Sequence, residues 1–248
     1  MSQSQLAGRT AVITGASRGL GAALALDFAT RGIRLGLCAR TAPVLPSGDE
    51  VLSVQLDVRD EKAVTDFVSR VEKRFGTIDL WINNAGVLEP IKPLRDVGLD
   101  EFREHIDINL IGLFVCSRAY VRHVRGRGAE GVLINISSGA AAHGYAGWSA
   151  YCAGKSAVDR LTECIQLEEA ESGLRAHAVA PGVIDTDMQT RIRNCSPADF
   201  PEVERFREMK RDDSYNTAGF VARHLLAIAF EPASRPDAVV VQLPDEKE

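Results

Sequence analysis

The chain has 248 residues, of which 45% are hydrophobic and 25% charged, with a net charge of −5 and five cysteines. Such a chain can bury a core without a disulfide or structural metal, and the cysteines lack both CxxC spacing and paired histidines, so no metal site is expected. The absence of a basic block argues against nucleic acid, and no apolar run approaches the roughly 18 residues of a membrane span. Residues 1–8 do not resemble a signal peptide, so a cytoplasmic location is expected.

Short runs rich in Val, Ile and Leu alternate along the chain with segments of helical periodicity, which is typical of successive βαβ units. Strands are predicted over residues 10–13, 34–38, 51–55, 80–83, 132–137, 176–180 and 239–243. Helices are predicted over residues 20–30, 61–75, 100–122, 154–172 and 217–230. The continuous hydrophobicity of the strands indicates that helices cover both faces of a parallel sheet. We predict an α/β fold, a single Rossmann-type domain over residues 1–248 with a doubly wound parallel sheet of about seven strands.

One stretch near the C-terminal end departs from this pattern. Residues 191–213 are charged and loop-rich, yet Phe200, Val203, Phe206 and Met209 recur every third residue. The stretch is either a solvated surface helix or a mobile lid, and we take residues 186–214 as a substrate lid within the domain.

The first predicted strand runs into a glycine-rich turn, residues 14–21 (TGASRGLG), which opens an Ala-rich helix. Gly15, Gly19 and Gly21 allow a tight turn, bring backbone N–H groups against a pyrophosphate, and let the helix pack closely on the strand. A bound phosphate would lie at the positive end of the helix dipole. A purely structural turn is the alternative, but the position between strand and helix favours a nucleotide site.

The residues after the second predicted strand bear on the choice of cofactor. In dinucleotide-binding folds an acid about 20 residues beyond the glycines binds the ribose 2′-OH. Here that position falls on Ala39, followed by Arg40. Arg40, with Arg18 in the turn itself, can pair with a 2′-phosphate, so NADP(H) is favoured over NAD(H). The alternative is two solvated surface arginines.

Tyr151 and Lys155 are four residues apart at the start of a helical segment, so their side chains share a face. A tyrosine hydroxyl titrates near pH 10, too high for acid/base work at neutral pH, and a nearby ammonium group is expected to lower its pKa. Ser138, at the end of a strand, can donate a hydrogen bond to the same substrate oxygen. The alternative is a tyrosine packed on a helix face beside a surface lysine.

Further motifs follow in chain order: Asp57 after the third strand, residues 83–86 (NNAG), Asn109, residues 151–155 (YCAGK), and Pro181-Gly182 with Thr186. Together with the glycine turn they resemble the short-chain dehydrogenase/reductase family in its single-domain form, over most of the chain. The resemblance implies an oxidoreductase that interconverts a ketone or aldehyde and an alcohol with NADP(H).

The resemblance also implies roles for individual residues. Tyr151 would be the acid/base and Ser138 would polarise the carbonyl oxygen, while Lys155 would hold the nicotinamide ribose and depress the Tyr151 pKa. Asn109 would position a water that links Lys155 to solvent. The implied catalytic residues are thus Asn109, Ser138, Tyr151 and Lys155. The expected cofactor-binding residues are Gly15, Ser17, Arg18, Gly19, Leu20, Gly21, Arg40, Asp57, Val58, Asn84, Ala85, Gly86, Tyr151, Lys155, Pro181, Gly182, Val183, Ile184 and Thr186.

Two stretches depart from the family pattern. Residues 41–50 contain Pro43 and Pro46 and are barely long enough for the usual crossover helix, which leaves the adenosine side of the site open. The C-terminal end lacks the family's Gly-Gly after the last strand. A homodimer or homotetramer is expected, with the helices over 100–122 and 154–172 as the dimer contact.

The expected substrate pocket is mostly apolar, which suits a ketone or secondary alcohol with hydrophobic bulk. Its predicted residues are Leu88, Gly139, Ala140, His143, Tyr145, Trp148, Val183, Met188, Ile192 and Phe200. His143 is either a substrate contact or a satisfied loop histidine. There are two alternative functions. A non-catalytic NADP-binding sensor or scaffold would be expected to lack one of the catalytic residues, and an isomerase or dehydratase would be expected to carry a longer C-terminal substrate domain.

Overall fold

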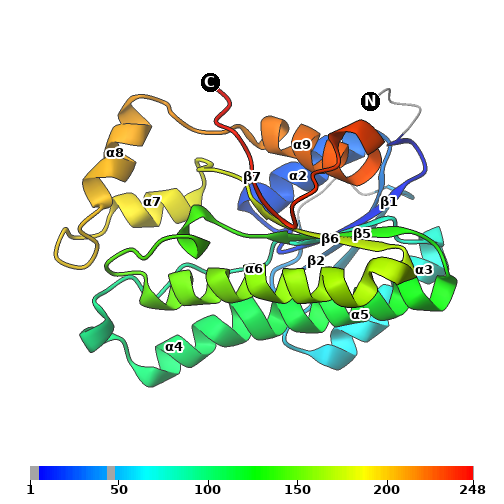
Figure 1. The fold of residues 1–248 in the computed structure, drawn as a ribbon, viewed down its shortest axis with the longest axis horizontal. Coiled ribbons are helices and arrows are strands. Elements are labelled where there is room, and N and C mark those ends of the chain that lie inside the picture. The colour runs from blue at the N-terminus through cyan, green and yellow to red at the C-terminus, as the bar shows by residue number, and fades with distance from the viewer. Residues whose placement is uncertain (1–5, 44–47, 248) are drawn as a thin grey trace.

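The computed structural model describes residues 6–43 and 48–247 and places seven strands of these ranges in one sheet (Figure 1). The strands are β1 (Thr10–Thr14), β2 (Arg34–Ala39), β3 (Val51–Gln55), β4 (Leu80–Asn83), β5 (Gly131–Ile136), β6 (Leu174–Ala180) and β7 (Val240–Gln242). Their order is β3-β2-β1-β4-β5-β6-β7, and all neighbouring pairs are parallel. The predicted α/β fold with a doubly wound sheet is confirmed. The strand order reverses between β1 and β4, where ligands of such sheets bind at the carboxyl ends.

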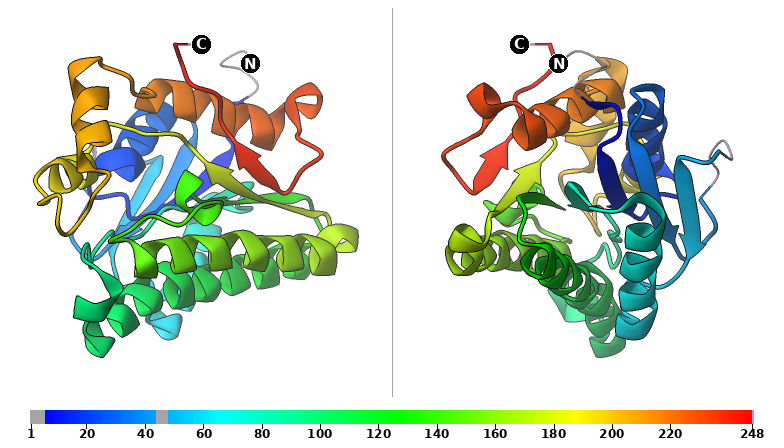
Figure 2. Two further views of the ribbon diagram at one scale, coloured as in Figure 1. Left: turned by 60° about the vertical axis from the view of Figure 1, so that its left-hand side comes forward. Right: turned by 90° about the vertical axis from the view of Figure 1, so that its right-hand side faces the viewer.

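Helices cover both faces of this sheet (Figure 2). They are α2 (Gly19–Thr30), α3 (Glu61–Phe75), α4 (Leu99–Ile106), α5 (Gly112–Arg127), α6 (Ser149–Glu169), α7 (Asp187–Arg193), α8 (Val203–Arg211) and α9 (Ala218–Phe230). On β1, Ile13 packs with α2 and α9, whereas Val12 packs with α3 and α5 on the other face. Both side chains are fully buried, which is why the strand reads as continuously apolar.

The helix predicted over 100–122 is in fact divided. It consists of α4, a π-helical turn over Asp107–Ile111, and α5. The apolar periodicity runs through all three, so the sequence carries no signal for the interruption. A π turn inserts an extra residue and redirects the side chains that follow, and such turns are frequent at functional sites. Asn109 lies inside this one.

One other helix begins earlier than predicted, and the last helix begins within one residue of its predicted start. The helix predicted over 154–172 begins earlier, at Ser149, because Trp148 and Tyr151 pack inward although the small residues between them carry little periodicity. The last helix begins at Ala218, with the Thr217 hydroxyl accepting from the Phe220 N–H at 3.1 Å as its N-cap. Residues 186–214, for which a surface helix or a mobile lid was expected, contain two short helices, α7 and α8.

The connection between β2 and β3 bears on the adenosine side of the expected cofactor site. Its residues 41–43 and 48–50 are not helical. Pro46, on which part of the expectation rested, lies outside the described residues.

Within residues 6–43 and 48–247, none of the helices is both long and apolar enough to cross a membrane.

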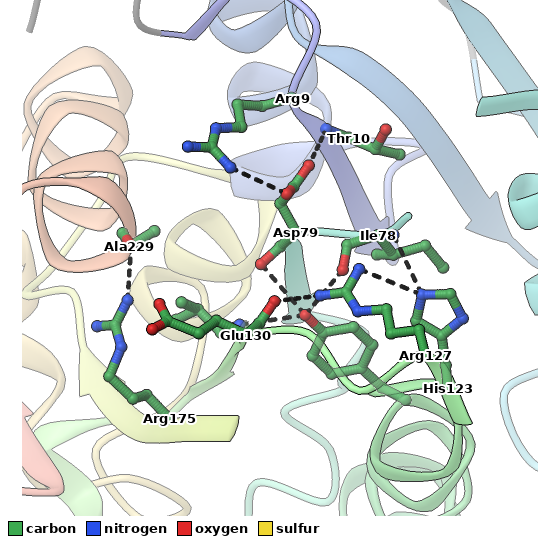
Figure 3. Close-up of polar contacts among 11 residues, drawn as sticks. Arg9, Thr10, Ile78, Asp79, His123, Arg127, Glu130, Arg175 and Ala229 are labelled. Atoms are coloured by element: carbon green, nitrogen blue, oxygen red, sulfur yellow. Dashed lines mark hydrogen bonds and ion pairs between the residues drawn. The ribbon is translucent and has the colours of Figure 1, made fainter. Parts of the chain in front are cut away.

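Polar contacts hold the amino-terminal ends of the strands, at the edge of the sheet opposite the glycine turn (Figure 3). The Asp79 carboxylate accepts from the Thr10 N–H at 2.8 Å and from Arg9 at 3.1 Å. The Ile78 N–H donates to His123 Nε2 at 3.1 Å, and burial lowers the pKa of His123. These groups satisfy strand ends within the protein, so this edge has a structural role and the opposite edge is left for chemistry.

Candidate active site

The glycine turn leaves the amino-terminal end of α2 available for an anion. The helix begins after Arg18, no side chain caps its first turn, and that turn contains no acidic residue. Gly15 has φ +67°, and a Cβ there would lie 2.7 Å from the Ala85 Cα, so turn and neighbouring loop meet backbone to backbone. Uncapped N–H groups at the positive end of a helix dipole bind phosphate groups well. The residues present therefore fit a dinucleotide pyrophosphate.

The loop after β4 is hydrogen-bonded directly to this turn. Asn84 Nδ2 donates to the carbonyls of Thr14 and Gly15 at 3.0 and 3.3 Å. The N–H groups of Asn84 and Ala85 both donate to Thr14 Oγ1 at 3.0 Å. The structure thus brings together two segments that were predicted separately as cofactor-binding. Thr14 links them, and its role was not recognised from the sequence.

The loop after β6 closes the other side of the turn. A cavity of about 680 Å³ is lined by Gly19, Leu20, Ile184 and Thr186, and also by residues near the C-terminal end that were not predicted. Among these, Asn216 Nδ2 donates to the carbonyls of Pro181 and Pro244 at 3.0 and 3.1 Å. Asn216 therefore ties the predicted 181–186 loop to the tail that follows β7, and no local pattern marks it.

Charged residues surround the end of β2, where the adenosine would lie. Arg40 is exposed. The Asp57 carboxylate is bound by Arg59, with 2.6 Å between Arg59 Nη2 and Asp57 Oδ2. That hydrogen bond is the main cause that lowers the pKa of Asp57, and the nearby Arg40 charge lowers it further. Arg59 was not among the predicted residues. Val58, which was, is buried and packs on Gly112 of α5.

Ser138, Tyr151 and Lys155 meet at the carboxyl end of β5. Ser138 lies beside the Tyr151 hydroxyl and lowers its pKa, and Ser138 Oγ accepts from the Ala140 N–H at 3.2 Å. Lys155 Nζ donates to the Ile136 carbonyl at 2.7 Å and lies 5.7 Å from the centroid of the Tyr151 ring. Tyr151 is buried and Lys155 half-buried. The alternative of a surface lysine beside a packed tyrosine therefore does not describe this chain.

The protonation behaviour of the pair differs from the sequence-based expectation. Burial raises the pKa of Tyr151 above its usual value, and the Ser138 hydrogen bond offsets this only in part. Burial also lowers the pKa of Lys155 to about 8, although Asp159 opposes that shift. The predicted lowering of the Tyr151 pKa by Lys155 is thus not found in the protein by itself, because desolvation is the largest cause of the shift and raises the pKa.

Asn109 is held by the backbone of Val87. Its Oδ1 accepts from the Val87 N–H and its Nδ2 donates to the Val87 carbonyl, both at 2.8 Å. The second Nδ2 hydrogen is directed to His105 Nε2 at 2.7 Å. The side-chain amide therefore has no hydrogen left to donate, and any water that Asn109 holds must donate to it.

The predicted pocket residues divide into two groups. Most of them pack in one apolar cluster with Tyr151, in which Trp148 stacks on Phe200 with 4.4 Å between ring centroids. The predicted members of this cluster are Leu88, Ala140, Tyr145, Trp148, Met188, Ile192 and Phe200. His143 is exposed and, like Gly139, lies outside the cluster.

The stretch predicted as a lid contributes to the same cluster. Phe200, Val203 and Phe206 are buried, and Met209 is partly buried against them. The spacing of three therefore marks an inward-facing row and not a wholly solvated helix. Two buried atoms in this region, Trp148 Nε1 and Gln189 Oε1, have no hydrogen-bond partner within the part of the chain that the structure describes.

Comparison with known proteins gives consistent results. The family model described as short chain dehydrogenase matches residues 9–196. The chain is 33% identical over 223 residues to benzil reductase ((S)-benzoin forming) of Bacillus subtilis, covering 88% of this chain and 91% of that protein. It is 38% identical over 187 residues to cis-4-hydroxycyclohexanecarboxylate dehydrogenase of Sinomonas cyclohexanicum, covering 73% and 75%. The crystal structure of levodione reductase superimposes with a TM-score of 0.84 at 28% identity, covering 96% of both chains.

Proposed function

The chain belongs to the short-chain dehydrogenase/reductase family and is an oxidoreductase acting on alcohol or carbonyl groups, and from this premise we propose that it is an NADP(H)-dependent carbonyl reductase with Tyr151 as its acid/base. The observation that carries the proposal is the meeting of Tyr151, Ser138 and Lys155 at the sheet edge that also holds the uncapped end of α2. A proton donor, an oxygen-binding hydroxyl and an anion site would then lie at the carboxyl ends of the same sheet's strands.

Each of the three residues has a distinct proposed role in the reaction. The bound nicotinamide would supply or accept the hydride. Because burial raises its pKa, Tyr151 keeps its proton at neutral pH and can donate it to a carbonyl oxygen. Ser138 donates to the same oxygen and stabilises the charge that develops there. Lys155, held on the Ile136 carbonyl, places a positive charge beside the tyrosine ring.

Arg40 supports the choice of NADP(H). It is exposed beyond β2, and among residues 6–43 and 48–247 its guanidinium has no carboxylate within ion-pair distance, unlike Arg59 on Asp57. A guanidinium without a partner can bind a 2′-phosphate in bidentate fashion. Arg18, at the N-cap of α2, is also exposed and is the second cationic group on this side.

The substrate class follows from the apolar cluster. Aromatic side chains beside Tyr151 favour a ketone with cyclic or aryl bulk, and the relatives described above are named for benzil and for a hydroxycyclohexane acid. The unpartnered Trp148 Nε1 can donate to a second polar group of such a substrate. Ile111, Phe114 and Leu167 are exposed on the π turn, α5 and α6, which supports a homodimer or homotetramer through these helices.

The experiment that tests this function is a substrate panel read by NADPH and NADH absorbance. The panel contains aryl ketones, cyclohexanones, short aliphatic ketones and the matching alcohols. We expect NADPH-dependent reduction of the cyclic and aryl ketones, with little turnover of the short aliphatic ones. Absence of turnover with either cofactor across the panel would contradict the proposal and favour a non-catalytic binding protein.

Arg40→Asp is expected to reverse the cofactor preference. The aspartate repels a 2′-phosphate and accepts from a ribose 2′-OH, so kcat/KM should fall with NADPH and rise with NADH, changing the ratio by about 100-fold or more. Arg34→Asp, at the other end of β2, is the matched control and should leave the ratio unaltered. An unaltered ratio in Arg40→Asp removes Arg40 from the cofactor site.

A further inference from the structure

His105 is a buried histidine next to the candidate catalytic residues, and the function proposed above makes no use of it. It lies on α4 and is 1% exposed. Both ring nitrogens are engaged, Nδ1 with the Glu89 carbonyl at 2.6 Å and Nε2 with Asn109 Nδ2 at 2.7 Å. A buried histidine with both ring nitrogens hydrogen-bonded is restricted in its protonation state as well as in its orientation.

The protonation state follows from the backbone of Val87. Its N–H must donate and its carbonyl must accept, and they face Asn109 Oδ1 and Nδ2 respectively. This pair determines which way the Asn109 amide points without reference to the histidine. Nδ2 therefore presents an N–H to His105, and Nε2 must accept it. The proton of the neutral ring is then on Nδ1, where the Glu89 carbonyl accepts it.

His105 also contacts the helix that carries the catalytic pair. Its ring meets the Tyr151 ring edge to face, with 6.1 Å between centroids and planes inclined at 81°. A Cβ on Gly154, the residue before Lys155, would lie 3.4 Å from His105 Nε2, so α4 and α6 are in van der Waals contact at this point. The same imidazole thus touches the tyrosine, the turn that bears the lysine, and the asparagine.

We propose that His105 is a positioning residue for the reaction. As the neutral Nδ1–H tautomer it holds the Asn109 amide in the π turn and the Tyr151 ring on α6. Uptake of a proton on Nε2 releases Asn109. The proposal rests on the function proposed above. Protonation would place an N–H of the ring against an N–H of the amide. Turning the amide to relieve this clash would break both of its bonds to Val87.

Burial, more than the surrounding charges, keeps His105 neutral at physiological pH. Burial is the largest cause that lowers its pKa, and the Lys155 ammonium on α6 acts in the same direction. The Glu89 carbonyl and the Glu89 carboxylate oppose the shift, and that carboxylate is itself paired with Arg191 of α7. Tyr151, also on α6, stays uncharged at neutral pH because its pKa is raised. Proton uptake is therefore expected below pH 6.5, the ordinary value for histidine.

The test compares His105→Leu and His105→Gln with the wild type in steady-state reduction between pH 5 and pH 8. Leucine fills the space without accepting a hydrogen bond, so kcat at pH 7 should fall by about tenfold or more, a part of the roughly 10²- to 10⁴-fold that acid/base catalysis contributes. The KM for NADPH should change by less than about threefold, because His105 lies away from the phosphate site. In the wild type we expect kcat to decline below pH 6.5, as His105 takes up a proton. Glutamine accepts from Asn109 and cannot titrate, so His105→Gln should keep most of the wild-type kcat at pH 7 and should not show this decline.

His123→Gln is the matched control. His123 is also buried, also accepts a hydrogen bond through Nε2, and also has a lowered pKa, but it lies at the opposite edge of the sheet. In this variant kcat should still decline below pH 6.5, as in the wild type. Thermal denaturation of every variant separates loss of fold from loss of positioning.

A second measurement does not depend on turnover. The ¹⁵N chemical shifts of the imidazoles report the tautomer, and His105 should show a protonated Nδ1 at pH 7. A protonated Nε2, a wild-type kcat in His105→Leu, or an unaltered acid decline in His105→Gln would each overturn the proposal. If Tyr151→Phe remains active, the proposed function itself fails; if Tyr151→Phe is inactive while the His105 variants behave as wild type, only the role of His105 fails.

Discussion

Tyr151→Phe is expected to lower kcat for NADPH-dependent carbonyl reduction by on the order of 10³-fold, within the range that general acid catalysis supplies. The variant removes only the phenolic O–H. The ring keeps its contacts with His105 and Trp148, so fold and cofactor binding should persist. Turnover is measured by NADPH absorbance and cofactor binding by fluorescence titration.

Tyr120→Phe is the matched control for this result. Tyr120 is also fully buried, but its hydroxyl donates to the Ile78 carbonyl at 3.1 Å at the opposite edge of the sheet. Its removal should lower thermal stability while kcat stays near the wild-type value. Turnover of Tyr151→Phe within tenfold of wild type would show that another group donates the proton.

Trp148→Ala should destabilise the protein by about 3–5 kcal/mol, the usual cost of deleting a large buried aromatic side chain. Trp148 is 5% exposed and stacks on Phe200. It also meets Tyr145, Tyr151 and Phe206 at centroid distances of 5.3, 5.4 and 5.6 Å. The variant should therefore loosen residues 200–206 and the first turn of α6 together. Urea denaturation gives the free energy of unfolding.

Two further variants separate the packing of Trp148 from its hydrogen bonding. Trp148→Phe keeps an aromatic ring in the stack but lacks the indole N–H, so a rise in substrate KM with little loss of stability would support a contact between Nε1 and the substrate. Leu26→Ala, at a residue of α2 that is 48% exposed and lies outside the proposed oligomer contact, should cost less than about 1 kcal/mol. A similarly small loss in Trp148→Ala would contradict the observed packing of residues 200–206 on α6.

Local pattern was enough to predict the framework of the site. The glycine turn, the strands and the Tyr151–Lys155 spacing depend on short-range rules: backbone freedom at glycine, continuous burial of parallel strands, and the four-residue period of a helix face. The place of Ser138 at the end of a strand added it to the same site, and the resemblance to the family added Asn109. In the structure, Ser138, Tyr151 and Lys155 meet at the carboxyl end of β5, and Asn109 follows α4 beside them.

Features that depend on contacts between distant segments could not be predicted in this way. The apolar periodicity continues through the π turn that contains Asn109, and nothing around His105 or Asn216 marks them as site residues. The direction of the Tyr151 pKa was wrong for the same reason, since spacing places an ammonium nearby but does not report how much water is removed.

The sequence by itself determined the fold class, the place of the glycine turn and the spacing of the proposed catalytic pair, because each depends on residues close together in the chain. Only the tertiary structure decided which protons those residues hold and what supports them. Desolvation and hydrogen bonding are set by groups brought from elsewhere: Val87 and Glu89 from the loop after β4, His105 from α4, and Phe200 from the segment before α8.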